Sequence, residues 1–275
     1  MQKQMTPDPD VDTEVGIDED LPGTAEGEGP RRRGIYLLPN LFTTGGLFAG
    51  FYAIVAAMAG HFEPAAIAVF VAMIMDGLDG RIARLTHTES AFGKEYDSLS
   101  DMVSFGLAPA LVMYEWSLRG MVDYGWAWGK LGWLGAFFYT ISAALRLARF
   151  NVRHGSVDKR YFQGLPSPAA AGLIAGAVWF CSNWDIPGQA VILPAYILTI
   201  LAGALMVSSI GYYSFKDLNL QGRVPFTAIV LVALVLIVVF LSPQNVLFVG
   251  FFLYAFSGML LALWRLQRRL RRKTV

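Results

Sequence analysis

Four aspartates stand within 26 residues in the stretch "MDGLDGRIARLTHTESAFGKEYDSLSDMVSFG", residues 75–106. Asp76 and Asp79 are three positions apart, and Asp97 and Asp101 are four apart, so each pair shares one face of a helix. Carboxylates beside hydrocarbon are costly and therefore rare, and they indicate a functional site. A single aspartate near the end of a span usually snorkels or caps a helix, but four at these spacings do not fit that interpretation.

Small residues share both faces, with Gly80 and Ala83 beside the first pair and Gly93 beside the second. Carboxylates gathered in so small a space repel one another. Mg²⁺ or Mn²⁺ relieves this repulsion, since these cations take oxygen ligands and share them with substrate phosphates. Arg84 flanks the first face and can pair with phosphate. Ser104 lies on the second face and is expected to bond to its own helix. The pattern predicts a metal-assisted site for a phosphate-containing substrate.

The rest of the chain predicts an all-α, polytopic membrane protein. It has 275 residues, 55% of them hydrophobic and 16% charged, and a mean hydropathy of +0.47. Apolar runs of near twenty residues are long enough to cross a bilayer. We expect about eight spans, at roughly 36–58, 63–85, 97–118, 130–150, 166–183, 189–212, 224–241 and 244–264. The aspartates lie at the facing ends of the second and third spans.

Charge divides the chain into three parts. Residues 1–30 hold nine acidic residues and one basic residue, and we expect a disordered acidic tail. Residues 31–264 form the predicted membrane domain, and the basic segment 265–275 is a predicted cytoplasmic tail that anchors the topology and touches anionic headgroups. Every second connection is rich in Lys and Arg, which predicts that both termini and the aspartates face the cytoplasm. No nucleic-acid partner is expected.

The aspartate stretch resembles the CDP-alcohol phosphatidyltransferases. It matches their pattern D-x2-D-G-x2-A-R-x8-G-x3-D-x3-D without a gap. The resemblance implies a six-helix core, here followed by two C-terminal spans, and a homodimer. It implies two divalent ions held by the four aspartates, a CDP-linked lipid as donor, and CMP as the leaving group. Asp101 is the implied general base for the acceptor hydroxyl. The implied CDP and phosphate contacts are Gly80, Ala83, Arg84 and Gly93.

Three further stretches resemble the bacterial phosphatidylserine synthases of this family: "LLPNLFTTGGLFAGFYAI" (37–54), "RLARFN" (146–151) and "YFQGLPSPAAAG" (161–172). This implies transfer from CDP-diacylglycerol to L-serine at a bacterial inner membrane. Asn40 and Thr43 either contact the nucleotide or only begin a helix after Pro39. Arg146 and Arg149 either hold the serine carboxylate or are ordinary positive-inside residues. "GLPSP" is expected to be a turn that opens the fifth span.

Three other functions remain open at this point. A sibling enzyme could use glycerol 3-phosphate or an inositol phosphate as its acceptor. A divalent-cation transporter would also place acids in the membrane, but spans four to eight hold no carboxylate to continue a path. A scaffold protein would leave the aspartates unexplained.

Overall fold

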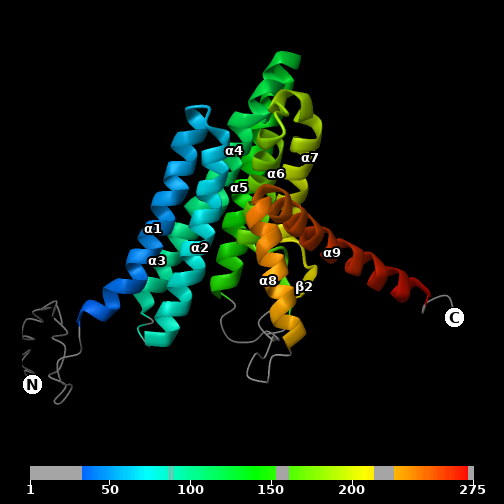
Figure 1. Ribbon diagram of the computed structural model, residues 1–275. Coiled ribbons are helices and arrows are strands. Elements are labelled where there is room, and N and C mark those ends of the chain that lie inside the picture. The colour runs from blue at the N-terminus through cyan, green and yellow to red at the C-terminus, as the bar shows by residue number, and fades with distance from the viewer. Residues whose placement is uncertain (1–32, 87, 89, 153–160, 214–225, 272–275) are drawn as a thin grey trace, which may run out of the picture. The chain divides into compact units, whose positions relative to one another are not determined.

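The computed structural model describes residues 33–86, 88, 90–152, 161–213 and 226–271, so the predicted acidic tail lies outside the described residues. The described part is almost wholly helical (Figure 1), as an all-α protein requires. In chain order its elements are α1 (Arg33–Met58), α2 (Phe62–Thr86), α3 (Ala91–Asp101), η1 (Met102–Leu107), α4 (Ala108–Trp116), η2 (Leu118–Tyr124), α5 (Trp126–Val152), β1 (Tyr161–Gln163), α6 (Ser167–Asn183), η3 (Gly188–Val191), α7 (Ile192–Val207), β2 (Gly211–Tyr213), α8 (Phe226–Leu241) and α9 (Pro243–Arg271).

Each of the eight predicted spans coincides with a helical segment. Among the described residues, four helical stretches are long and apolar enough to cross a membrane: Leu38–Met58, Trp126–Val152, Gly188–Val207 and Pro243–Leu261. Other predicted spans are too charged or too short to be counted with these four. Helix α2 carries the charged residues of the aspartate motif, and α6 and α8 have only 17 and 16 residues. The chain is an all-α membrane protein, and eight crossings stay a prediction.

The structure departs from several predicted boundaries: α1 begins at Arg33 and contains Pro39, so no helix starts after that proline, and α9 continues to Arg271, past the predicted end of the eighth span. The sixth span was expected to reach residue 212, but α7 ends at Val207 and β2 pairs antiparallel with β1. Tyr212 in this ribbon is buried, and its hydroxyl donates to the Ala255 carbonyl of α9 at 2.9 Å. The third span begins earlier than expected, at Ala91, because the Ser90 side chain caps the helix by accepting from the Gly93 amide at 2.9 Å.

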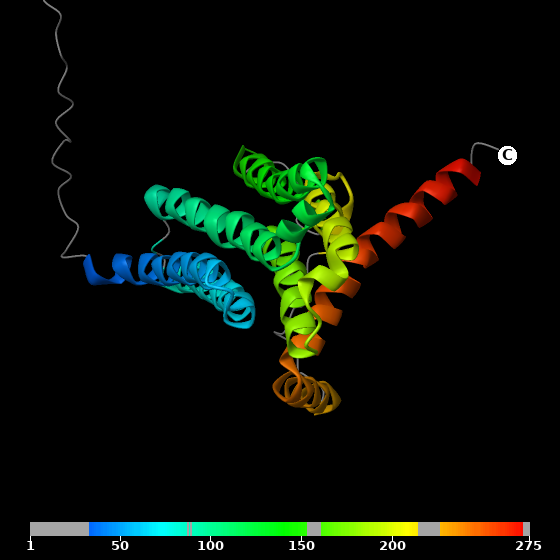
Figure 2. The ribbon, with the colours of Figure 1, turned by 90° about the horizontal axis from the view of Figure 1, so that it is seen from above.

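Helix α6 lies in the core, against α2 on one side and α9 on another (Figure 2). Its buried run from Ala169 to Val178 consists largely of alanine and glycine. A Cβ at Gly172 would lie 2.7 Å from the Phe251 ring, and one at Gly176 would lie 3.1 Å from the Phe248 Cα. Small residues allow helices to approach closely where no hydrophobic effect drives them together. The α6–α9 contact therefore depends on these glycines.

Helices α3, η1 and α4 follow one another without a break from residue 91 to 116, and η1 is a π-helical segment directly after Asp101. Insertions of this kind are frequent at functional sites. The buried Tyr139 of α5 donates to the Phe105 carbonyl inside η1 at 3.1 Å. Helix α5 thus supports the widened turn that follows the last aspartate.

Candidate functional site

All four aspartates line one small cavity between α1, α2 and the α3–η1 segment. Helix α2 contributes Asp76 and Asp79, and α3 contributes Asp97 and Asp101. Of the connection between α2 and α3, only Thr88 and Ser90 are described. Because this connection is short, α3 begins close to the end of α2. The predicted meeting of the two acidic faces is therefore found in the structure.

The carboxylates are not equivalent. One oxygen from each of Asp76, Asp97 and Asp101 lies within 4.8 Å of the others, and these three side chains are half-buried. Asp79 is only 5% exposed, and its Oδ2 accepts a hydrogen bond from the Thr43 hydroxyl at 2.7 Å. The site thus consists of three converging carboxylates and a fourth, that of Asp79, whose orientation is set by a hydrogen bond from α1.

These four charges act on one another across the cavity. In the described part of the chain, none of them forms an ion pair with a basic side chain. Oxygens this close, with no protein cation between them, suit a hard divalent ion, which accepts several carboxylates at once. The residues present fit the divalent metals that the aspartate motif predicts.

Of the six residues predicted to contact the CDP group, Thr43 lines this cavity and the other five are not part of its lining. Asn40 approaches α3, since a Cβ built on Gly93 would lie 3.4 Å from its Oδ1. A Cβ at Gly80 would meet nothing within 4 Å, so the space beside this residue is open. Arg84 is exposed and its Nε donates to the Gly80 carbonyl at 2.8 Å. Ala83, one position before Arg84, is half-buried.

Two serines of the second acidic face attach α1 to the site, and the sequence analysis missed this role. Ser100 Oγ donates to the Thr43 carbonyl at 3.2 Å, and Ser104 Oγ donates to the Gly46 carbonyl at 3.1 Å. The expectation that Ser104 bonds to its own helix was wrong, because α1 comes close enough to offer a carbonyl instead. Gly50 permits this approach, since a Cβ there would lie 2.6 Å from Ser104 Oγ.

The two arginines predicted to hold the acceptor differ in their surroundings. Arg149 Nη2 donates to Gln163 Oε1 at 2.9 Å and its Nη1 to the Val207 carbonyl at 3.3 Å, so it braces the β1–β2 ribbon. Arg146 is half-buried, its charge interacts with that of Asp101, and its Nη1 donates to Ser167 Oγ at 2.7 Å. Of the two, Arg146 is therefore the one whose charge interacts with an aspartate of the site.

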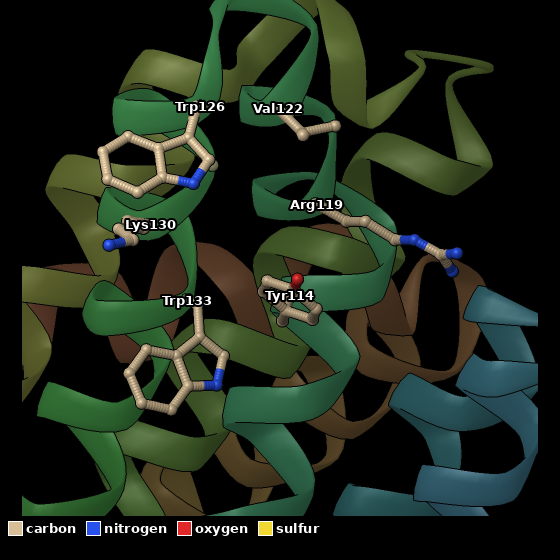
Figure 3. A pocket seen from close by; sticks show the side chains of 7 residues that line it. Tyr114, Arg119, Val122, Trp126, Lys130 and Trp133 are labelled. Carbon is tan, nitrogen blue, oxygen red and sulfur yellow. The ribbon is translucent and has the colours of Figure 1, made fainter.

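A second, open pocket lies where α4, η2 and the start of α5 meet (Figure 3). Its volume is about 380 Å³, and Trp126, Lys130 and Trp133 project from the α5 side while Tyr114 and Arg119 come from the α4–η2 side. Lys130 Nζ lies 3.7 Å from the centre of the Trp126 ring. Helix α4 leads away from Asp101 toward this pocket, so it lies at the opposite end of the helices from the aspartates.

Comparison with known proteins supports the interpretation of the aspartate site. A CDP-diacylglycerol–serine O-phosphatidyltransferase of Helicobacter pylori is 37% identical over 227 residues, which are 82% of this chain and 91% of that protein. A protein of the same name from Mycobacterium leprae is 38% identical over 173 residues, 56% of this chain and 55% of its own. An archaetidylserine synthase of Methanothermobacter thermautotrophicus is 35% identical over 177 residues, 64% of this chain and 69% of its own.

Residues 36–207 match the family model of the CDP-alcohol phosphatidyltransferases. This segment begins in α1 and ends with α7, so it contains the four aspartates, Thr43 and Arg146. Helices α8 and α9 follow it. The chain belongs to the CDP-alcohol phosphatidyltransferase family.

Proposed function

We propose that this protein transfers the phosphatidyl group of CDP-diacylglycerol to the hydroxyl of L-serine, releasing phosphatidylserine and CMP. The observation that carries the proposal is the cavity in which Asp76, Asp97 and Asp101 converge, in a chain that is 37% identical to a protein named for this reaction. CDP-diacylglycerol and L-serine are accordingly the proposed substrates.

The metal sites would be formed by the four aspartates. Asp76, Asp97 and Asp101 offer converging oxygens, and Asp79 offers a carboxylate already oriented by Thr43. We infer two ions, Mg²⁺ or Mn²⁺, because four carboxylates and a pyrophosphate carry more negative charge than one ion can balance. When bound, such ions neutralise the charge that develops on the attacking and leaving oxygens.

Asp101 is the proposed general base. Its carboxylate takes the proton of the serine hydroxyl while the hydroxyl oxygen forms a bond to the phosphorus of the phosphatidyl group. The bond from that phosphorus to the oxygen of CMP breaks, and CMP leaves with the electron pair. A base for this step must lie within hydrogen-bond reach of the hydroxyl. Asp101 lies beside the other carboxylates and within electrostatic range of Arg146, so donor and acceptor would meet at it.

The nucleotide side of the site would be formed by α1, α2 and the start of α3. Asn40, Thr43, Gly80, Ala83, Arg84 and Gly93 are the proposed CDP and phosphate contacts. Open space beside Gly80 leaves room for the donor to approach the backbone, and the exposed guanidinium of Arg84 is available for a phosphate oxygen.

On the acceptor side, Arg146 would pair with the serine carboxylate. Arg149 is a weaker candidate than Arg146, because Gln163 and the Val207 carbonyl already accept from it. A phosphorylated acceptor such as glycerol 3-phosphate or an inositol phosphate would call for additional cations. Of the two further arginines that could supply them, Arg149 is engaged and Arg153 lies outside the described residues.

The distribution of basic residues supports a cytoplasmic orientation of the site and of both termini in a bacterial inner membrane. The C-terminal half of α2 carries Asp76 and Asp79, and the C-terminal end of α5 lies beside α3, since Asn151 Nδ2 donates to Ser98 Oγ at 2.9 Å. Arg81, Arg84, Arg146 and Arg149 therefore gather at one end of the helices. A homodimer is the proposed assembly, by analogy with the family.

The test is CMP release by the purified protein in detergent with CDP-diacylglycerol and Mn²⁺ or Mg²⁺. L-serine, glycerol 3-phosphate and an inositol phosphate are offered separately, with the Asp101→Asn variant as control. We expect release with L-serine only, and its loss with EDTA and in the variant. Release with another acceptor would keep the aspartate site and reject serine. No release from folded protein with any acceptor would reject the enzyme and favour a cation transporter.

A further inference from the structure

Arg146 has an unusual environment for a charged side chain. Its Nε is buried and meets no acceptor anywhere in the described ranges. A buried donor without a partner is destabilising, more so when it is charged, so native proteins seldom keep one without a reason. The orphaned Nε is a donor to which a ligand could bind.

Within the described residues, this guanidinium donates to one side chain, that of Ser167. Ser167 is 1% exposed and is the first residue of α6. The guanidinium is planar and its N–H groups diverge in fixed directions, so a hydrogen bond at Nη1 also restricts where Nε points. By accepting this hydrogen bond, Ser167 therefore restricts the orientation of the whole Arg146 guanidinium.

The backbone before Ser167 is itself held in place. Gly164 has a φ of +79°, and its amide donates to the Ile210 carbonyl at 2.8 Å. A Cβ at this position would lie 2.2 Å from the Met206 carbonyl oxygen, so no other residue fits there without movement. The Leu165 amide donates to the Leu205 carbonyl at 2.9 Å. The "GLPSP" turn opens α6, as expected, and its hydrogen bonds to Leu205 and Ile210 also fix where Ser167 lies.

The surroundings of Arg146 connect it with the reaction centre. Asp101 is the aspartate whose charge interacts with it, and the hydroxyls of Tyr139 and Tyr254 are also within electrostatic range. Tyr254 belongs to α9, which packs against α6. A cation within electrostatic range of the proposed base and of two hydroxyl groups suits a small acceptor that carries a carboxylate close to its nucleophilic hydroxyl.

We propose that Ser167 is a positioning residue for the acceptor: its hydroxyl holds the Arg146 guanidinium so that the orphaned Nε, together with a terminal N–H, binds the acceptor carboxylate. The inference rests on the proposed transfer to an amino-acid hydroxyl and adds a residue and a donor atom to it. In L-serine the hydroxyl is two carbons from the carboxylate carbon, so a carboxylate fixed on Arg146 leaves the hydroxyl for Asp101.

The experiment compares Ser167→Ala with wild type in the CMP-release assay, varying L-serine and CDP-diacylglycerol independently. Loss of one hydrogen bond to a charged group corresponds to about a tenfold change in an equilibrium constant. We therefore expect the KM for L-serine to rise about tenfold, while kcat and the KM for CDP-diacylglycerol change by less than threefold. Ser167→Thr, which restores a hydroxyl, should recover part of the lost affinity.

Ser142→Ala is the matched control, because Ser142 is equally buried and its hydroxyl donates within α5, to the Phe138 carbonyl at 2.7 Å. It should leave the KM for L-serine unchanged. If Ser167→Ala does not yield folded protein, Ser167→Cys keeps the side-chain volume with a weaker acceptor and should give the same KM shift.

An unchanged KM for L-serine in folded Ser167→Ala or Ser167→Cys protein would overturn the inference while the proposed function stands. Equal losses in kcat and in both KM values would also overturn it, since a purely structural role predicts them. Failure of the wild-type protein to use L-serine would reject the proposed function instead, so the two failures are distinguishable.

Discussion

The contact between α1 and the π-helical segment η1 allows a stringent test of how the aspartate site is held together. Gly50 faces Ser104 so closely that an added Cβ would lie 2.6 Å from Oγ and 2.8 Å from Cα. The hydroxyl can rotate away, but the Cα belongs to the backbone of η1. Gly50→Ala must therefore push the two helices apart.

The expected magnitude follows from two opposing contributions. Replacing glycine by alanine inside a helix stabilises it by about 1 kcal/mol, whereas forcing an extra methyl group into a packed contact costs about 1–3 kcal/mol. Gly250→Ala in α9 is the matched control, because a Cβ there meets nothing within 4 Å and gains only the first contribution. Gly50→Ala should thus be about 1–3 kcal/mol less stable than Gly250→Ala.

The assay is thermal unfolding in detergent, read out by circular dichroism, followed by CMP release from both variants. At about 3 °C per kcal/mol for a chain of this size, Tm should be roughly 3–9 °C lower for Gly50→Ala than for Gly250→Ala. Activity should fall as well, because moving α1 breaks the hydrogen bonds from Ser100 and Ser104 that hold Thr43 beside Asp79. Equal or higher Tm for Gly50→Ala would refute the close contact.

Three further predictions concern single side chains. Asp97→Asn should weaken Mn²⁺ binding at least about tenfold in titration calorimetry, because it removes one of three converging charges; unchanged affinity would place the metal elsewhere. Thr43→Val keeps the shape but leaves Asp79 without its 2.7 Å donor, so it should lower kcat about tenfold while the variant remains folded; wild-type kcat would show that the orientation of Asp79 is unimportant. Arg149→Lys should lower Tm by a few degrees through its bonds to Gln163 and Val207 and leave the KM for L-serine within threefold of wild type; a large KM change would make Arg149 a ligand of the acceptor.

The aspartates could be found from sequence because helix geometry alone brings them together. Two pairs at helical spacing, in segments joined by a short connection, leave few arrangements in which the acidic faces do not meet. The apolar runs likewise predicted the helical segments, since every span needs a similar length of chain. The β1–β2 ribbon could not be found in this way, because strands of three residues are too short for a period-two pattern.

Other features depend on contacts between residues far apart in the chain. Ser104 and Gly46 are 58 positions apart, and only the approach of α1 decides that the hydroxyl bonds to Gly46 and not to its own helix. Contacts with distant residues also distinguish Arg146 from Arg149, which in sequence are equivalent positive-inside residues at one helix end. Their roles differ because Gln163 and Val207 lie beside Arg149.

Arg146 illustrates how an incomplete hydrogen-bond set can locate a ligand where charge alone cannot. A snorkelling arginine would point its guanidinium into water and satisfy every donor there, and a purely structural one would find protein acceptors for its buried donors. Arg146 does neither at Nε, while a buried serine fixed by the "GLPSP" turn holds its Nη1. In the proposed complex the acceptor carboxylate completes this set, and the acceptor hydroxyl then lies toward Asp101, whose charge interacts with that of Arg146. Selection of an amino-acid acceptor would thus reside in the α5–α6 contact, apart from the aspartates proposed to bind the metal ions and the shared CDP group.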